Sequence, residues 1–196
     1  MSDLAKKFMS ISVWITIVLF VIRCLIDSSG IALAINQREY LNCSYSIYGY
    51  AGEAIGATAI FMAVFNKWLW KKKPFYLLTG ELPVLAKHYR GTITFVWDGV
   101  EQTRNSEIWI DQTFLNVSVK LGTNESTSNS ITASIEKVNS EQKLIYTYLN
   151  TPRAELQNRS AIHYGTAMLC VDDSKKLTGN YYTCLLYTSP SPRDMR

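Results

Sequence analysis

The chain changes character at a short basic segment, Trp70-Lys71-Lys72-Lys73-Pro74. Two long apolar stretches precede this segment, and a region rich in Thr, Ser, Tyr and Ile follows it. The later region has frequent turn signals and no long helical periodicity, which indicates β structure. The sequence therefore predicts a two-helix transmembrane region over residues 1–73, a cytoplasmic β domain over residues 74–183 and a foreign tail over residues 184–196.

Both apolar stretches are long enough to cross a bilayer. The first runs from Phe8 to Ile26 and the second from Ile47 to Trp70, and about 20 apolar residues span the hydrocarbon core. The loop between them, residues 27–46, carries Arg38 as its only cation, whereas lysines flank the outer ends of the two stretches: Lys6, Lys7, Lys67, Lys71, Lys72 and Lys73. Because basic flanks stay in the cytoplasm, we expect a multi-pass protein of the bacterial inner membrane with both termini cytoplasmic.

A cleaved signal peptide is an alternative for the first stretch. Lys6 and Lys7, the apolar run and Ala32-Leu33-Ala34 imitate its parts. Arg23 and Asp27 interrupt the approach to that cleavage site, and the run is longer than a usual signal core, which favours a retained helix. Since Arg23 and Asp27 are four residues apart, we expect them to pair on one helix face.

The second stretch carries a strip of small residues at steps of three and four: Gly49, Gly52, Gly56, Ala59 and Ala63. Small residues let membrane helices approach closely, so the strip serves either packing between the two helices of one chain or assembly between chains. Glu53 lies beside the strip, and a carboxylate within the bilayer is costly. Glu53 is therefore either hydrogen-bonded between helices or part of a pathway that assembly creates.

The distribution of charge argues against binding of a nucleic-acid polymer. The net charge is +4, yet residues 74–183 carry ten Lys and Arg against eleven Asp and Glu. A domain that binds DNA or RNA needs a basic surface, and this domain is nearly neutral. A small anionic ligand remains compatible with the sequence, because a few placed arginines are enough to hold it.

The sequence predicts no metal, no cofactor and no catalysis. The four cysteines (Cys24, Cys43, Cys170 and Cys184) and the two histidines (His88 and His163) lack the spacing of metal sites or redox pairs. A P-loop, a Gly-x-Ser-x-Gly elbow and a zinc signature are also missing from the sequence.

Alternating apolar and polar residues predict strands with one buried face in the region after residue 88. Ile93, Phe95 and Trp97 show this pattern, as do Leu144, Tyr146 and Tyr148. Seven candidate strands precede residue 184, and glycines inside strands are typical of the bends of a small barrel: Gly91, Gly165 and Gly179. We therefore expect an all-β domain, a lipocalin-like up-and-down β-barrel whose last strand is missing.

We expect the tail to have a different origin from the rest of the chain, and a flexible Ser/Pro tail is the competing interpretation. Residues 184–194, Cys-Leu-Leu-Tyr-Thr-Ser-Pro-Ser-Pro-Arg-Asp, match a transposase-type sequencing adapter translated in frame. Such a segment is excluded from fold reasoning, so we expect the native sequence to be interrupted near Thr183.

The layout and two segments resemble the two-transmembrane, β-strand-rich effectors of CBASS, the cyclic-oligonucleotide antiphage signalling system of bacteria. The segments are Tyr89-Arg90-Gly91-Thr92, which opens the β domain, and Leu177-Thr178-Gly179-Asn180-Tyr181-Tyr182-Thr183 near its close. The resemblance covers residues 1–183. It implies that a cyclic dinucleotide, made by a partner nucleotidyltransferase, binds in the β-barrel, and that binding drives oligomerisation, inner-membrane disruption and death of the infected cell. Chains of this family continue with a basic stretch and a last strand, which the tail replaces here.

The residues offer suitable chemistry for such a ligand, because guanidinium groups suit phosphodiesters and aromatic faces suit bases. The candidates are Arg90, Arg153 and Arg159 for charge, and Trp97, Trp109, Tyr146, Tyr148 and Tyr181 for stacking. Arg153 and Arg159 belong to a longer polar connection, residues 150–162, that we expect over the barrel mouth. Ordinary barrel core is the competing interpretation of each aromatic residue, and solvated surface that of each arginine. The alternative function is a membrane-tethered, lipocalin-like carrier of a lipid or small apolar ligand, which predicts a cavity without a basic group.

Overall fold

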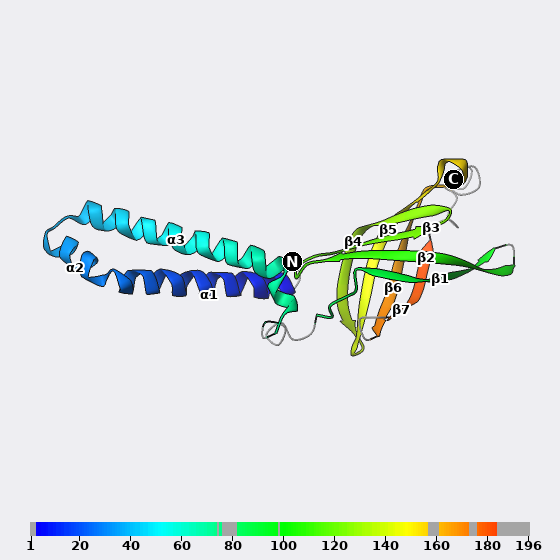
Figure 1. Cartoon of the computed structure of the whole chain (residues 1–196), viewed down its shortest axis with the longest axis horizontal. Helices are drawn as coiled ribbons and strands as arrows, with labels where there is room; N and C mark the ends of the chain where they lie inside the picture. Colours follow the sequence, from blue (N-terminus) through cyan, green and yellow to red (C-terminus); the bar gives the residue numbers. More distant parts are fainter. Residues whose placement is uncertain are drawn as a thin grey trace, which may run out of the picture. The chain divides into compact units, whose positions relative to one another are not determined.

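The computed structural model describes residues 3–73, 75, 82–97, 99–156, 161–172 and 176–183. The chain forms two compact units, Met1–Tyr76 and Leu77–Arg196. The first is helical and the second is an antiparallel sheet curled into a nearly closed barrel (Figure 1). This architecture confirms the predicted fold class.

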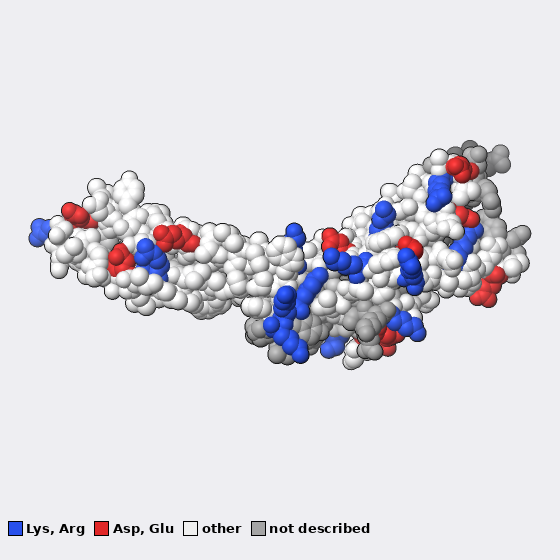
Figure 2. All heavy atoms as spheres, viewed as in Figure 1, with Lys and Arg blue, Asp and Glu red and all other residues white. Residues whose placement is uncertain are grey.

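The helical unit is a hairpin of two long helices. It contains α1 (Asp3–Ile26), α2 (Ser28–Asn36), α3 (Tyr40–Lys67) and the short 3₁₀ helix η1 (Leu69–Lys71). Two helical segments, Leu4–Ile26 and Tyr40–Lys67, are long and apolar enough to cross a membrane. Figure 2 shows charged side chains near the α2 end of this unit, and on the visible face the middle of the hairpin carries none.

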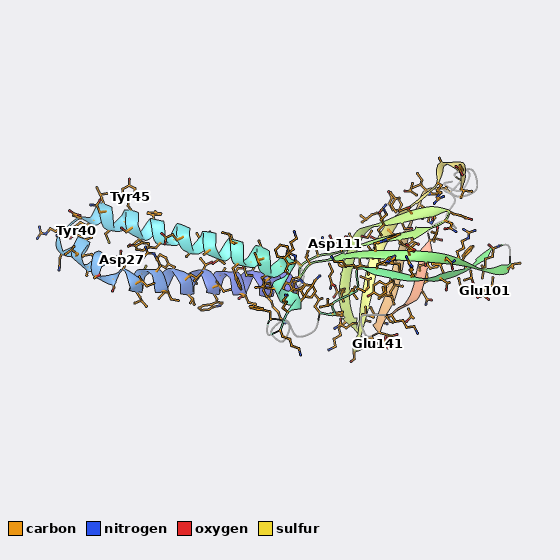
Figure 3. All side chains as sticks on the ribbon, in the orientation of Figure 1. Asp27, Tyr40, Tyr45, Glu101, Asp111 and Glu141 are labelled. Atoms are coloured by element: carbon orange, nitrogen blue, oxygen red, sulfur yellow. The ribbon has the colours of Figure 1, made fainter. Side chains whose placement is uncertain are left out.

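The segment between the two spans differs from the predicted loop. It is mostly helical, because α2 and the first turns of α3 occupy it. The reversal occurs at Arg38, whose φ of 59° is in the left-handed region. Asp27 and Tyr40 lie at this end of the hairpin (Figure 3). The prediction failed here because it used hydropathy and charge alone, whereas residues such as Ala32, Leu33 and Ala34 readily form helix.

The contact between α1 and α3 uses one face of α3. Its buried side chains are four residues apart: Tyr50, Ala54, Thr58 and Met62. The Thr16 hydroxyl donates to the Thr58 hydroxyl at 3.0 Å, and Thr58 donates to the Ala54 carbonyl at 2.8 Å. Spacing of four residues places side chains on one helix face, so this face defines how the hairpin packs.

The charged residues of the hairpin pair across the two helices. Arg23 Nε donates to Glu53 Oε2 at 2.9 Å, and its guanidinium lies 4.4 Å from the centre of the Tyr50 ring. Asp27 instead accepts a hydrogen bond from the Tyr50 hydroxyl. The predicted partnership of Arg23 with Asp27 is therefore replaced by contacts to α3, because the antiparallel packing brings Glu53 to Arg23 and the Tyr50 hydroxyl to Asp27.

The β unit is a meander in which sequence neighbours are spatial neighbours. Its seven strands have the order β1-β2-β3-β4-β5-β6-β7, and each pairs antiparallel with the next. The strands are β1 (His88–Trp97), β2 (Val100–Gln112), β3 (Val117–Thr123), β4 (Ser126–Val138), β5 (Glu141–Pro152), β6 (His163–Asp172) and β7 (Lys176–Thr183), and the 3₁₀ helix η2 (Ala154–Leu156) follows β5. Among the described residues, β1 and β7 each have one paired neighbour.

Short turns fix the register of the hairpins. Asn139 and Ser140 have φ of 51° and 68°, which is the pattern of a type I′ turn between antiparallel strands. Glu141 follows this turn and Glu101 lies near the tip of the β1–β2 hairpin (Figure 3). In that hairpin Gly99 has φ of 77°, a conformation that glycine adopts without a Cβ penalty.

The core of the β unit lies at one end of the barrel. Leu144 has no exposed surface, and the other buried core residues are Leu85, Ile110, Val117, Val119, Tyr146, Tyr148 and Ala167. The segment before β1 covers this end: Leu85 N–H donates to Gln112 Oε1 at 2.9 Å, and Gln112 Nε2 donates to the Pro83 carbonyl at 2.9 Å. The buried amide of Gln112 thus holds the covering segment in place.

Candidate functional site

The inward face of the sheet changes from apolar to polar along the barrel. Successive side chains of a strand point to opposite faces, so Ile110, Ile108, Ser106 and Arg104 of β2 follow one another on the inside. On β5 the inward series runs from Leu144 through Tyr146 and Tyr148 to Asn150. The register of the strands places the polar ends of both series at the end of the barrel that holds the β3–β4 turn. We call this region the polar end.

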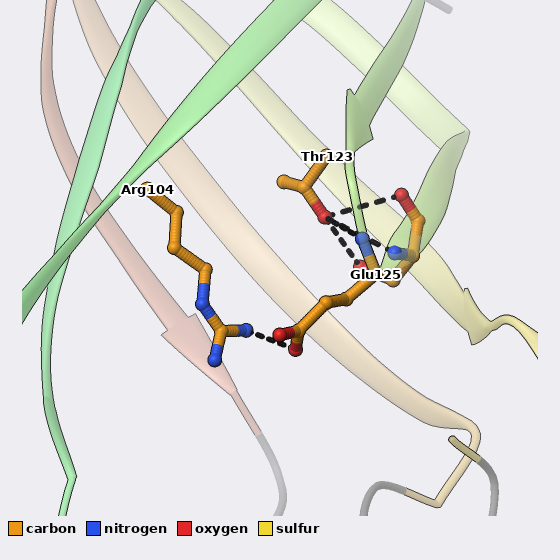
Figure 4. Close-up of polar contacts among 4 residues, drawn as sticks. Arg104, Thr123 and Glu125 are labelled. Atoms are coloured by element: carbon orange, nitrogen blue, oxygen red, sulfur yellow. Dashed lines mark hydrogen bonds and ion pairs between the residues drawn. The ribbon is translucent and has the colours of Figure 1, made fainter. Parts of the chain in front are cut away.

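Arg104 is the inward cation of the polar end. It forms an ion pair with Glu125, which belongs to the β3–β4 turn (Figure 4). Its guanidinium also lies 4.6 Å from the centre of the Phe95 ring of β1, a distance suited to a cation–π contact. Its side chain is 36% exposed, so the charge remains accessible from solvent.

Three of the predicted tyrosines lie on the same inner face. Tyr146 and Tyr148 have ring centres 5.9 Å apart and are 3% and 6% exposed. Tyr181 of β7 is opposite Ala167 of β6, which in turn is opposite Tyr146. Burial raises the pKa of Tyr146 to about 12. Burial also raises the pKa of Tyr181, and the charge of Arg104 acts in the opposite direction.

A glycine sets the position of Tyr148. Gly165 of β6 is opposite Tyr148, and a Cβ at residue 165 would lie 2.3 Å from Cζ and the hydroxyl oxygen of that ring. Because Gly165 has no side chain, the Tyr148 ring lies over the β6 backbone, and its hydroxyl donates toward the Tyr182 carbonyl at 3.5 Å. At Gly165 the role of a glycine inside a strand is specific: the absent side chain leaves room for the Tyr148 ring.

A buried polar pair completes the polar end. Ser128 Oγ donates to Asn150 Oδ1 at 2.8 Å, and both residues are 7% exposed. The Asn150 side chain also carries an amide donor group. A site that combines such amide groups with a cation and tyrosine rings has the chemistry to hold an anionic, aromatic molecule.

Two predicted site residues lie on the outer face of the sheet. Arg90 is 78% exposed and its Nε is 3.2 Å from Glu107 Oε1. Trp109, which is 40% exposed, stacks on His88 with ring centres 5.3 Å apart. The structure does not bring Arg90 or Trp109 together with the inward tyrosines, because residues of odd number on β2 and even number on β1 face outward.

The predicted connection after β5 is only partly described. Arg153 is exposed, and its backbone N–H donates to the Glu125 carbonyl at 2.9 Å. This contact places Arg153 beside the β3–β4 turn at the polar end. Arg159 and the side chain of Trp97 lie outside what the structure describes.

The outer face also has a shallow depression of about 450 Å³ between β2, β3 and β4. Trp109, Lys87 and Lys120 line part of it. It exists because β3 and β4 pair over only three residues, from Lys120 to Gly122 opposite Asn129 to Thr127, after which β4 separates from β3. It is a second location where an aromatic ring and cations occur together.

The small-residue strip of α3 lies away from the helix contact. All five of its residues, Gly49, Gly52, Gly56, Ala59 and Ala63, are exposed. A Cβ placed on any of the three glycines would meet no atom within 4 Å. The hairpin therefore packs through the Tyr50–Met62 face, and the strip faces outward beside Glu53, which pairs with Arg23.

Sequence reasoning missed Arg104, Ser128 and Asn150. The part of β2 that carries Arg104 does not alternate between apolar and polar residues, because every residue from 101 to 106 is polar. Both faces of the strand therefore look alike in the sequence. The inward position of Arg104 could have been predicted from strand periodicity, because counting back in steps of two from Ile110 and Ile108 reaches Arg104. Among the described residues, no three His, Cys, Asp or Glu side chains come together as metal ligands.

Comparison with known proteins identifies the family. The profile of the Cap15 cyclic dinucleotide receptor domain matches residues 81–188, more than half of the chain. A curated relative, CD-NTase-associated protein 15 of Staphylococcus schleiferi, is 29% identical over 183 residues, which is 93% of this chain and 92% of the relative. No solved structure gave a significant match. The chain thus belongs to the Cap15 cyclic dinucleotide receptor family, which is associated with CBASS, as the resemblance of its residues predicted.

Proposed function

We propose that this protein is a CBASS effector that binds a cyclic dinucleotide at the polar end of its barrel and then assembles in, and disrupts, the bacterial inner membrane. The observation that carries the proposal is Arg104, an inward cation on the same face of the sheet as Tyr146 and Tyr148, in a chain of the Cap15 receptor family. A partner nucleotidyltransferase would supply the ligand.

The proposed ligand contacts follow from the chemistry of the polar end. Arg104 is suited to a phosphodiester, because a guanidinium binds phosphate with two parallel hydrogen bonds. Tyr181, which is 37% exposed, offers a ring face for a base, and stacking of this kind contributes about 1–3 kcal/mol per base. Ser128 and Asn150 offer hydrogen-bonding groups for base edges. Arg153, on the adjacent connection, is a further candidate for charge.

The carrier of an apolar ligand is the weaker alternative. Such a carrier needs an apolar interior, whereas the polar end presents the ion pair of Arg104 and Glu125, and a charged pair next to an apolar ligand loses hydration. The apolar end of this barrel is filled by Leu144, Ile110 and Val119, whereas the polar end carries Arg104, whose side chain is 36% exposed.

Assembly through the strip on α3 is the second part of the proposal. The exposed glycines let a helix of another copy approach closely, and packing of small residues is a common driving force in membranes. Ligand binding must favour the assembled state over the monomer to change the equilibrium. Assembly would then place Glu53 and Arg23 near the contact between copies, with both termini on the cytoplasmic side where Lys6, Lys7 and the 71–73 lysines lie.

The proposal is tested with the full chain reconstituted in liposomes that contain a self-quenched dye. Cyclic di-AMP, cyclic di-GMP and cyclic GMP–AMP are added separately. The proposal predicts saturable binding of at least one of them, with dye release only when that compound is present. Binding without release would reject the disruption step, and absence of binding by a folded, reconstituted chain would reject the receptor function.

A further inference from the structure

The backbone of Glu125 in the β3–β4 turn is hydrogen-bonded through its N–H and its carbonyl, and its side chain reaches Arg104. Thr123 Oγ1 accepts the N–H of Glu125 at 3.2 Å and the N–H of Ser126 at 3.1 Å (Figure 4). On the other side, the Glu125 carbonyl accepts the Arg153 N–H at 2.9 Å. With both backbone groups hydrogen-bonded, the carboxylate can leave Arg104 by side-chain rotation while the turn keeps its shape.

Arg104 and Glu125 form an ion pair of opposite charges, but both side chains are partly exposed to solvent. The two side chains are 36% and 42% exposed, so water screens their attraction and the pair contributes little to stability. Arg104 also lies 4.6 Å from the centre of the Phe95 ring, a contact that does not involve Glu125. The pair thus combines a positioned cation with a weakly held counter-ion.

We propose that Glu125 is a displaceable internal competitor of the ligand, which occupies the phosphate-binding position of Arg104 until a cyclic dinucleotide replaces it. This inference rests on the proposed function and names how that site is regulated. A dinucleotide brings phosphodiester oxygens that accept the same hydrogen bonds as the carboxylate. Mononucleotides and single phosphates, which lack the second base and phosphodiester, gain fewer compensating contacts after displacing Glu125. The competitor therefore raises the ligand threshold at which the protein responds.

The test compares Glu125→Gln with Glu107→Gln in the full chain in detergent. Both changes remove one carboxylate that pairs with an arginine, but Glu107 pairs with Arg90 on the outer face. Binding of the tightest cyclic dinucleotide in the panel is measured by calorimetry, and Glu125→Asp, which shortens the side chain, serves as a second variant. Circular dichroism melts without ligand verify that each variant is folded.

The inference predicts that Glu125→Gln and Glu125→Asp lower Kd by about two- to fivefold, the range that corresponds to loss of one half-exposed ion pair. Glu107→Gln leaves Kd unchanged, and Glu125→Gln has no effect once Arg104→Ala is present, because the two groups act together. An unchanged or higher Kd for both Glu125 variants, with wild-type binding intact, overturns the inference and leaves the receptor function standing. No binding by wild type or by any variant overturns the receptor function itself.

Discussion

Replacing Gly165 with alanine should displace Tyr148 from the interior of the barrel. The added Cβ would lie 2.3 Å from the Tyr148 ring and 2.6 Å from the Tyr182 carbonyl oxygen, whereas ordinary contact begins at 3.4 Å. The ring and the β7 backbone would both have to move. Overpacking of this kind costs about 1–3 kcal/mol of folding free energy.

The cost can be assigned to the ring by a double-mutant cycle. Unfolding of the full chain in detergent by guanidinium is followed by circular dichroism for the wild type, Gly165→Ala, Tyr148→Ala and the double variant. We expect the cost of Gly165→Ala to fall by about 1 kcal/mol or more in the Tyr148→Ala background, because the clashing ring is gone. The contact with the Tyr182 carbonyl remains and retains part of the cost.

Gly91→Ala is the matched control, because a Cβ at this strand position meets nothing within 4 Å. Its stability should be unchanged or slightly higher, since alanine restricts the unfolded chain. The reasoning is refuted if Gly165→Ala costs the same with and without Tyr148, or if it costs no more than Gly91→Ala.

Three further outcomes follow from the same structure. Leu144→Ala should lower the free energy of unfolding in guanidinium by about 2–5 kcal/mol, because Leu144 is fully buried. Ile131→Ala, at a residue that is 58% exposed, should change it little. Equal losses of stability in the two variants would contradict the assigned core. Tyr146 should make the fold sensitive to alkali: because its folded pKa is raised to about 12 from 10, its contribution is complete below pH 10 and is lost as the pH rises to about 12, a total of about 3 kcal/mol. Tyr146→Phe should flatten that part of the stability–pH curve, and an identical curve would show that Tyr146 ionises freely. Gly56→Leu should preserve cyclic dinucleotide binding and abolish dye release, because the bulky side chain separates the strips of neighbouring copies; release at the wild-type level would exclude the strip from assembly.

The sequence revealed the architecture because its main signals are local. Apolar length and flanking lysines predicted the two membrane helices, and alternation such as Leu144, Tyr146 and Tyr148 predicted strands with one buried face. The frequent turn signals predicted short connections between strands, and hairpins in succession give a meander. The helical content of residues 28–36 was missed, because the prediction treated a chain segment between two spans as a loop.

The site was harder to predict because it depends on which side of the sheet each residue faces. Arg90 and Trp109 are attractive by residue type, but their positions in the register place them outside. Arg104 is one residue in a polar strand; periodicity from Ile110 gives the face that it lies on, but its pairing with Glu125 depends on the turn between β3 and β4. The partners of Arg23 likewise lie on the other helix, which a one-helix spacing argument cannot reveal.

The most direct test of the receptor site compares two arginines on opposite faces of the sheet. Affinity for the best-bound cyclic dinucleotide is measured by calorimetry for the full chain in detergent, with Arg104→Ala and Arg90→Ala as matched variants. The account predicts saturable wild-type binding, at least about tenfold weaker binding for Arg104→Ala, since a charge-assisted contact contributes about 1.5–3 kcal/mol, and unchanged binding for Arg90→Ala. Loss of affinity in Arg90→Ala with retention in Arg104→Ala would move the ligand to the outer face and contradict the account.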